Sequence, residues 1–210
     1  MQKGVFAVCA LALSLVVAST ASAQTCMGFS PISKDHPAQV GAGYAHTNGT
    51  NTVYGDGTFG NEQFFGNASI GHVSVTGAGW GLFNVTGGGQ LNVKSMDKEW
   101  GVCPDATFQL QFGNALTASV LSYFGGVAVG GNVYSKNKMG IVPTAMIQFG
   151  QARVKGIPNS ADSYGVLTFG VGFVFQENMT LRPALTQTFA QAGGQSTGFM
   201  LDFRYAFGKK

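Results

Sequence analysis

In several runs of this chain, large apolar side chains recur at every second residue. This two-residue period limits the folds that the chain can adopt. In the last run, Phe199, Leu201, Phe203, Tyr205 and Phe207 alternate with Met200, Asp202, Arg204 and Ala206. A β-strand places alternating side chains on opposite faces, whereas a helix scatters them around its circumference. The same period marks residues 108–112, 121–133, 141–149, 167–175 and 181–189, and more weakly residues 40–44, 73–75 and 80–93. Residues 48–61 and 95–104 are rich in Gly, Asn, Ser and charge, which is typical of connecting loops. The chain is therefore predicted to be all-β.

The residues on the opposite face indicate which way the apolar face points. They are mainly Gly, Ala, Ser, Thr and Gln, and charged residues make up only 10% of the chain, against roughly a quarter in soluble domains. A soluble lipocalin-like barrel would expose this face to water and carry many Lys and Glu on it. A membrane barrel instead turns its apolar face to lipid. We therefore expect a transmembrane barrel, with the soluble barrel as the alternative.

The N-terminus has the pattern of a secretory signal peptide. Lys3 precedes an apolar stretch over residues 5–17, and Ala21-Ser22-Ala23 has the small residues of a cleavage site. The alternative, a transmembrane anchor, fits less well because the apolar stretch is short. We expect residues 1–23 to be a cleaved signal peptide, residues 24–37 an N-terminal extension, and residues 38–210 the barrel domain.

Cleavage would remove Cys9 and leave Cys26 and Cys103 in an oxidising compartment. Two cysteines permit one disulfide, which we expect, although two free thiols kept apart by the fold are the alternative. No C-x-x-C motif or histidine cluster accompanies them, so neither a catalytic nor a metal-binding role is expected.

The residues resemble a known family, the small Gram-negative outer-membrane β-barrel proteins of the OmpA-, OmpX- and opacity-protein-like group. The resemblance rests on the signal at residues 3–23, the hairpin over residues 167–189 with its Glu177-Asn178 turn, and the final strand over residues 198–207. It implies a closed antiparallel up-and-down transmembrane β-barrel in the outer membrane of a Gram-negative bacterium. It also implies a C-terminal assembly signal of Phe203, Tyr205 and Phe207 that the outer-membrane assembly machinery reads. Outer-membrane lipid would be the other partner, and we expect a monomer.

The number of strands is less constrained by the sequence. Nine runs alternate, and a single-chain bacterial barrel closes with an even number of strands. We expect eight, with one early run outside the barrel and chain left over for long loops. The alternative is ten strands, if residues 85–93 fold back at Gly87-Gly88-Gly89.

Few residues have the pattern of a chemical site. Histidines occur at His36, His46 and His72, and nothing in the sequence fixes a carboxylate beside His72. The glycine clusters lack the lysine and following helix of a phosphate loop. Arg182, Asp202 and Arg204 fall on the lumen side of the last two strands. Because unpaired charges are costly in a narrow lumen, we expect them to form a paired cluster that fills it.

These patterns favour a non-enzymatic protein with a structural or surface-interaction role through its loops, and no cofactor or metal. The alternative is a narrow pore or small-ligand channel, and a soluble lipocalin-like binding barrel comes third. The formal net charge is +3 without a run of like charges, so nucleic acid is not an expected partner.

Overall fold

The computed structural model describes residues 26–29, 36–61, 63–77, 81–94, 100–113, 119–131, 134–136, 139–155, 161–176, 178–190 and 194–208. The signal-peptide prediction for residues 1–23 lies outside them, as does Glu177 of the predicted turn. The long strands are β1 (Ala38–Thr47), β2 (Thr50–Gly60), β3 (Phe64–Val75), β4 (Gly81–Leu91), β6 (Trp100–Phe112), β7 (Val120–Gly131), β9 (Met139–Val154), β10 (Asp162–Phe175), β11 (Met179–Ala190) and β12 (Gln195–Phe207). Two short strands, β5 (Val93–Lys94) and β8 (Tyr134–Lys136), pair with β6 and β9.

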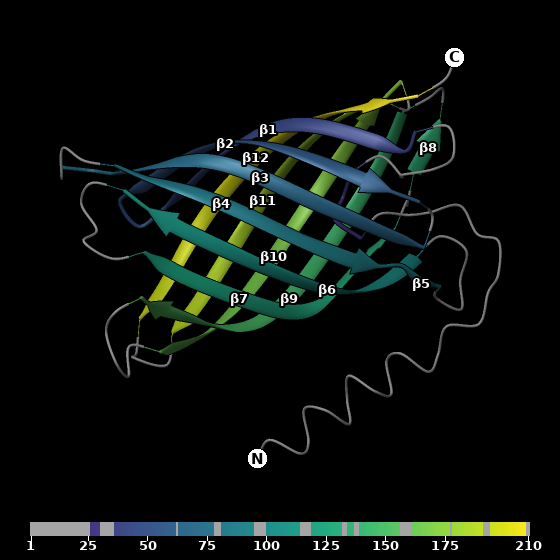
Figure 1. Ribbon diagram of the computed structural model, residues 1–210. Helices are drawn as coiled ribbons and strands as arrows, with labels where there is room; N and C mark the ends of the chain where they lie inside the picture. The colour runs from purple at the N-terminus through teal and green to yellow at the C-terminus, as the bar shows by residue number, and fades with distance from the viewer. Residues whose placement is uncertain are drawn as a thin grey trace, which may run out of the picture.

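The long strands form a closed antiparallel barrel. Each pairs with the next along the chain, and the last strand returns to the first, with Ala38 opposite Phe207 and Thr47 opposite Gly198. Every long strand therefore has two hydrogen-bonded neighbours, and the sheet has no open edge. Because the number of strands is even, β1 begins and β12 ends at the same end of the barrel, which we call the terminus end (Figure 1). The opposite end is called the loop end.

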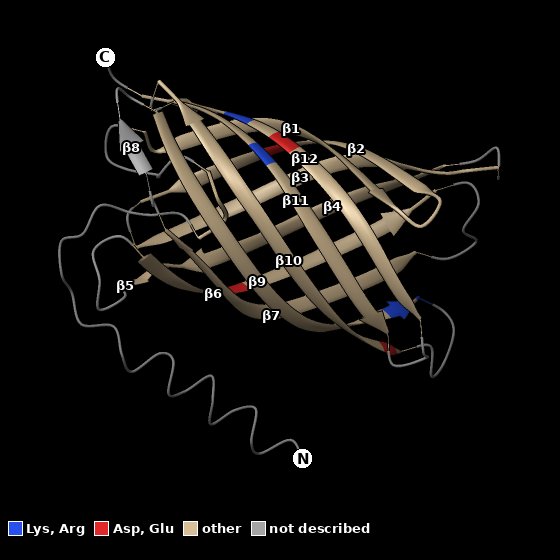
Figure 2. Ribbon diagram, turned by 180° about the vertical axis from the view of Figure 1, so that it is seen from behind, with Lys and Arg blue, Asp and Glu red and all other residues tan. Residues whose placement is uncertain are grey.

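Large apolar side chains point outward around the whole barrel. All five predicted outward positions of β12 are exposed, from 38% at Tyr205 to 49% at Phe207. Their inward neighbours Asp202, Arg204 and Ala206 are buried, and charged positions are sparse along the strands (Figure 2). The predicted outward direction of the apolar face is thus the one observed. Among the described residues, no helix is long and apolar enough to cross a membrane.

The barrel has ten long strands, so the expectation of eight is wrong. The additional strand is β2, in a segment whose polar composition predicts a loop. Two of its outward positions, Gly55 and Gly57, hold no side chain, and this weakens the apolar alternation that marks a membrane strand. The predicted fold-back at Gly87-Gly88-Gly89 does not occur, because β4 runs through all three residues.

The strand boundaries leave only short connections, in contrast to the long loops that we expected. Connections at the loop end cover only residues 48–49, 76–80, 113–119, 155–161 and 191–194. The residues that an eight-stranded barrel would leave for loops instead form β2 and extend the other strands, of which β9 has 16 residues.

Depth in the membrane predicts the effect of a charge on the outer face. Phe169 lies midway along β10 and is 58% exposed, whereas Ser163 faces outward near the loop end of the same strand. We expect Phe169→Arg to lower the free energy of unfolding by about 2–4 kcal/mol, and Ser163→Arg by about 0–1 kcal/mol. Urea unfolding in lipid vesicles measures both. Equal losses would contradict a lipid-facing belt at the middle of β10.

Candidate functional site

The lumen holds a cluster of buried charges near the terminus end. Arg182 of β11 pairs with Asp202 of β12, with Nη1 3.1 Å from Oδ2. Arg204 of β12 pairs with Asp56 of β2, with Nη2 2.5 Å from Oδ2. Each of these side chains is at most 8% exposed. The structure therefore brings the three predicted residues together and adds Asp56, so that two carboxylates balance two guanidiniums.

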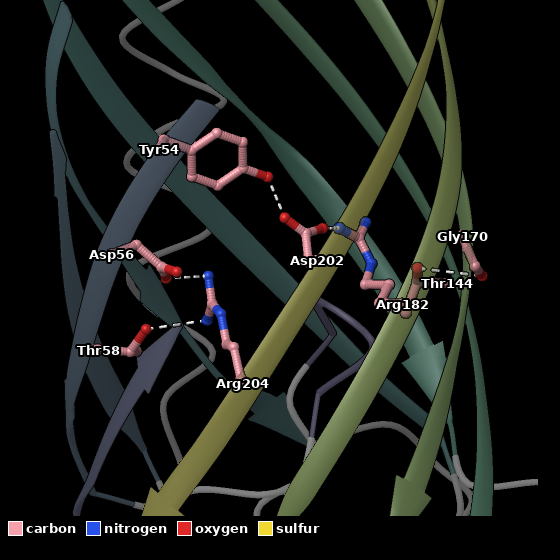
Figure 3. A network of polar contacts seen from close by, with 8 residues as sticks. All are labelled: Tyr54, Asp56, Thr58, Thr144, Gly170, Arg182, Asp202 and Arg204. Carbon is pink, nitrogen blue, oxygen red and sulfur yellow. Dashed lines mark hydrogen bonds and ion pairs between the residues drawn. The ribbon is translucent and has the colours of Figure 1, made fainter. Parts of the chain in front are cut away.

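Two neutral side chains of β2 complete the cluster (Figure 3). The Tyr54 hydroxyl donates a hydrogen bond to Oδ1 of Asp202, and Arg204 Nη1 donates to Oγ1 of Thr58 at 2.9 Å. Sequence reasoning missed Tyr54, Asp56 and Thr58 because it assigned their segment to a loop. Once β2 is recognised, their two-residue spacing places all three on the lumen face.

Glycines in β1 leave the space that these contacts need. β1 lies between β2 and β12, and its lumen-facing positions Gly41 and Gly43 carry no side chain. A Cβ at Gly41 would lie 2.6 Å from both Asp56 Oδ1 and Arg204 Cγ. A Cβ at Gly43 would lie 2.7 Å from Asp202 Oδ1. The Arg204–Asp56 and Tyr54–Asp202 contacts therefore cross β1 over these two glycines. In the sequence, the glycines at positions 41 and 43 are the feature that indicates such contacts.

A short N-terminal segment, Cys26–Phe29, lies against the lumen wall. Cys26 forms a disulfide with Cys103, as predicted, and the two residues are 1% and 0% exposed. Cys103 belongs to β6 rather than to the loop that the sequence suggested. The Phe29 ring is 2% exposed, and its centroid lies 3.7 Å from the Arg204 guanidinium carbon and 5.2 Å from that of Arg182.

The segment fits closely against small residues of the wall. Gly28 has a φ of +80°, which glycine adopts without strain. A Cβ at Gly28 would lie 3.0 Å from Thr144 Cγ2 and 3.1 Å from Arg182 Nε. A Cβ at Gly130 would lie 3.0 Å from the Cα of Cys26. The segment is thus seated among β7, β9 and β11.

A separate carboxylate, Asp105, lies on the lumen face of β6. Gln148 of β9 donates a hydrogen bond to its Oδ2 across Gly126 of β7. Its Oδ1 and both amide atoms of the neighbouring Gln90 are buried and have no hydrogen-bond partner among the described residues. No described cationic side chain pairs with Asp105, in contrast to Asp56 and Asp202.

The remaining predicted residues lie on the outer face. Phe203, Tyr205 and Phe207 pair with β1 and point outward, and their reading by the assembly machinery stays a prediction. His46 Nδ1 lies 2.9 Å from Asn51 Oδ1, and the His72 ring packs edge-on against Phe83 at 5.4 Å. In the part of the chain that is described, no group of three or more His, Cys, Asp or Glu is placed to hold a metal ion.

The similarity of this chain to known proteins is one of fold alone. No protein-family model and no curated protein sequence matches the chain. Among solved structures, the chain is similar to a bacterial polysaccharide outer membrane secretin, with a TM-score of 0.48 and 9% identity over 81% of this chain and 65% of that one. It is also similar to the beta domain of the Bordetella autotransporter Brka, with a TM-score of 0.43 and 12% identity over 83% and 100%. For the KdgM porin in complex with disordered oligogalacturonate, the TM-score is 0.38 and the identity 11% over 80% and 99%. The narrower resemblance to the OmpA-, OmpX- and opacity-protein-like group is not borne out.

Addition of one methyl group on the lumen face of β1 tests whether the charge cluster needs the space over Gly41. We expect Gly41→Ala to lower the free energy of unfolding by about 1–3 kcal/mol, because its Cβ would overlap Asp56 and Arg204. Gly57→Ala on β2 is the matched control. Its Cβ would have no neighbour closer than 4.0 Å, so we expect no loss of stability. Equal losses in urea titrations of the folded barrels would contradict the role assigned to Gly41.

Proposed function

We propose that this protein is an integral outer-membrane β-barrel that forms a narrow passive channel for small hydrophilic solutes. The observation that carries the proposal is the lining of the lumen toward the loop end. Many partly exposed lumen-facing residues there are uncharged and polar, namely Thr52, Thr86, Gln109, Gln111, Thr186, Thr188 and Ser196. The charged Asp162 and the apolar Val166 and Met200 share this lining. Such a surface hydrates readily and binds no solute strongly, as passive diffusion requires.

The width of the barrel also supports a channel. An eight-stranded barrel is just wide enough for side chains to fill its interior. Ten strands enlarge the circumference beyond that of an eight-stranded barrel. This larger circumference favours a continuous passage from the charge cluster to the loop end.

A structural role is the second candidate. It is favoured by the filled terminus end, where Phe29 and the paired charges of Arg182 and Arg204 leave little exposed surface. Surface interaction through long loops is less favoured, because the connections at the loop end are short.

The proposal includes the route to the membrane. Residues 1–23 would be removed as a signal peptide, and residues 38–210 would insert as the barrel domain after the assembly machinery reads Phe203, Tyr205 and Phe207. The apolar outer face would then contact outer-membrane lipid. We propose a monomer, because the closed sheet offers no edge strand for pairing. Neither catalysis nor nucleic-acid binding forms part of this function.

Conductance through a barrel freed of its N-terminal segment tests the channel. We expect a variant lacking residues 24–35 to give discrete channel openings in planar lipid bilayers, and to admit small sugars in liposome-swelling assays. A faster gel mobility before boiling than after boiling would establish that the variant is a folded barrel. A folded variant that neither conducts nor admits sugars would contradict the channel and favour the structural role.

Ion preference provides a second test of the channel. Among the lumen-facing side chains that the structure describes, Asp56 and Asp202 balance the two guanidiniums, whereas Asp105 and Asp162 have no described cationic partner. We expect open channels to prefer cations, and Asp105→Asn to reduce the preference measured by the reversal potential in a salt gradient. Asp162→Asn, close to the loop end, is the matched control and should have a smaller effect because water screens its charge. No change with Asp105→Asn would contradict a passage beside this carboxylate.

A further inference from the structure

Residues Cys26–Phe29 contact much of the inner circumference of the barrel. The disulfide joins the segment to β6, while Gly28 lies beside Thr144 of β9 and Arg182 of β11. Phe29 places its ring against Arg204 of β12. Four residues thus contact strands on both sides of the lumen, as a plug across a passage would.

The segment is held in two different ways. At Phe29 the contacts are non-covalent. The ring packs on the guanidiniums of Arg182 and Arg204, whose edges are paired with Asp202 and Asp56. At Cys26 the bond to Cys103 is covalent. A covalent tether keeps the segment at a high effective concentration beside its seat, so brief departures of the ring end in rebinding.

We propose that Cys26–Phe29 is a plug that closes the channel and that the Cys26–Cys103 disulfide is its latch. This proposal rests on the proposed channel function. A small dithiol would open the latch by thiol–disulfide exchange. The disulfide accepts two electrons and two protons, giving the thiols of Cys26 and Cys103, while the dithiol is oxidised to its own disulfide.

The position of the latch suits a stable closed state. Both cysteines are almost fully buried, and the attacking thiolate must reach a sulfur in line with the bond. Large reductants are therefore excluded, and only a small dithiol that enters the lumen can open the latch. In an oxidising compartment the closed form would be the resting state.

Single-channel recording of four forms of the refolded chain tests the latch. The forms begin at residue 24, or at residue 36 in the deletion variant. They are the oxidised chain, the double variant Cys26→Ser/Cys103→Ser, the variant Phe29→Ala with the disulfide intact, and the variant lacking residues 24–35. We expect the oxidised chain to stay closed and the double variant to be open at least tenfold more of the time. Its openings should have the unit conductance of the deletion variant. Phe29→Ala should open only briefly, because the tether remains.

Dithiothreitol supplies the matched chemical test. It should open the oxidised chain and leave the double variant unchanged. Gel mobility before and after boiling identifies the folded barrels, so a form that fails to fold is not read as closed. If the double variant misfolds, dithiothreitol added to the folded oxidised chain still tests the latch.

The outcomes separate the latch from the channel. If the deletion variant conducts but the double variant and the reduced chain stay closed, the latch is overturned and the channel stands. If the oxidised chain conducts as freely as the deletion variant, the plug is overturned while the channel again stands. If the folded deletion variant is silent, the channel itself fails and the latch fails with it.

Discussion

The hydrogen bonding of the backbone in an apolar surrounding is the constraint on which the rest of this structure depends. A peptide N–H or C=O that faces lipid without a partner costs several kcal/mol, so a sheet in a membrane must close on itself. The pairing of β12 with β1 supplies that closure. Once the sheet is closed, alternate residues point to lipid and to the lumen. The apolar belt and the polar interior both follow from this alternation.

Closure of the sheet also encloses inward-pointing charged side chains, and in the charge cluster such side chains pair with one another. The guanidiniums of Arg182 and Arg204 point into the lumen, where they are shielded from bulk water and are stabilised by partners of opposite charge. Arg182 finds this partner on the adjacent strand, in register with Asp202. Arg204 finds it two strands away at Asp56, which is within reach because Gly41 carries no side chain between them. The glycines of β1 thus belong to the cluster as spacers.

The parts of this fold that were predictable from the sequence are those where outward positions all hold large apolar residues. In β12 every outward position from Phe199 to Phe207 does, so its direction and the lumen positions of Asp202 and Arg204 followed from the two-residue period. In β2, glycine at two outward positions interrupted the apolar alternation. The strand was therefore missed, and the lumen position of Asp56 was missed with it. The disulfide was predictable because only Cys26 and Cys103 remain after the expected cleavage. The place of Phe29 was not, because a single ring outside any periodic run gives no indication of what it packs against.

The seat of Phe29 is formed by interactions that do not involve the segment itself. The edge of the Arg204 guanidinium is held by Asp56 and Thr58, and that of Arg182 by Asp202, so their orientations are set by β2 and β12. The planar face of a guanidinium held in this way remains available to an aromatic ring, which it attracts through the ring quadrupole. Departure of the segment would leave these edge contacts intact. The same cluster that stabilises the wall would therefore stay ready to receive the ring again, and closure would not require the barrel to rearrange.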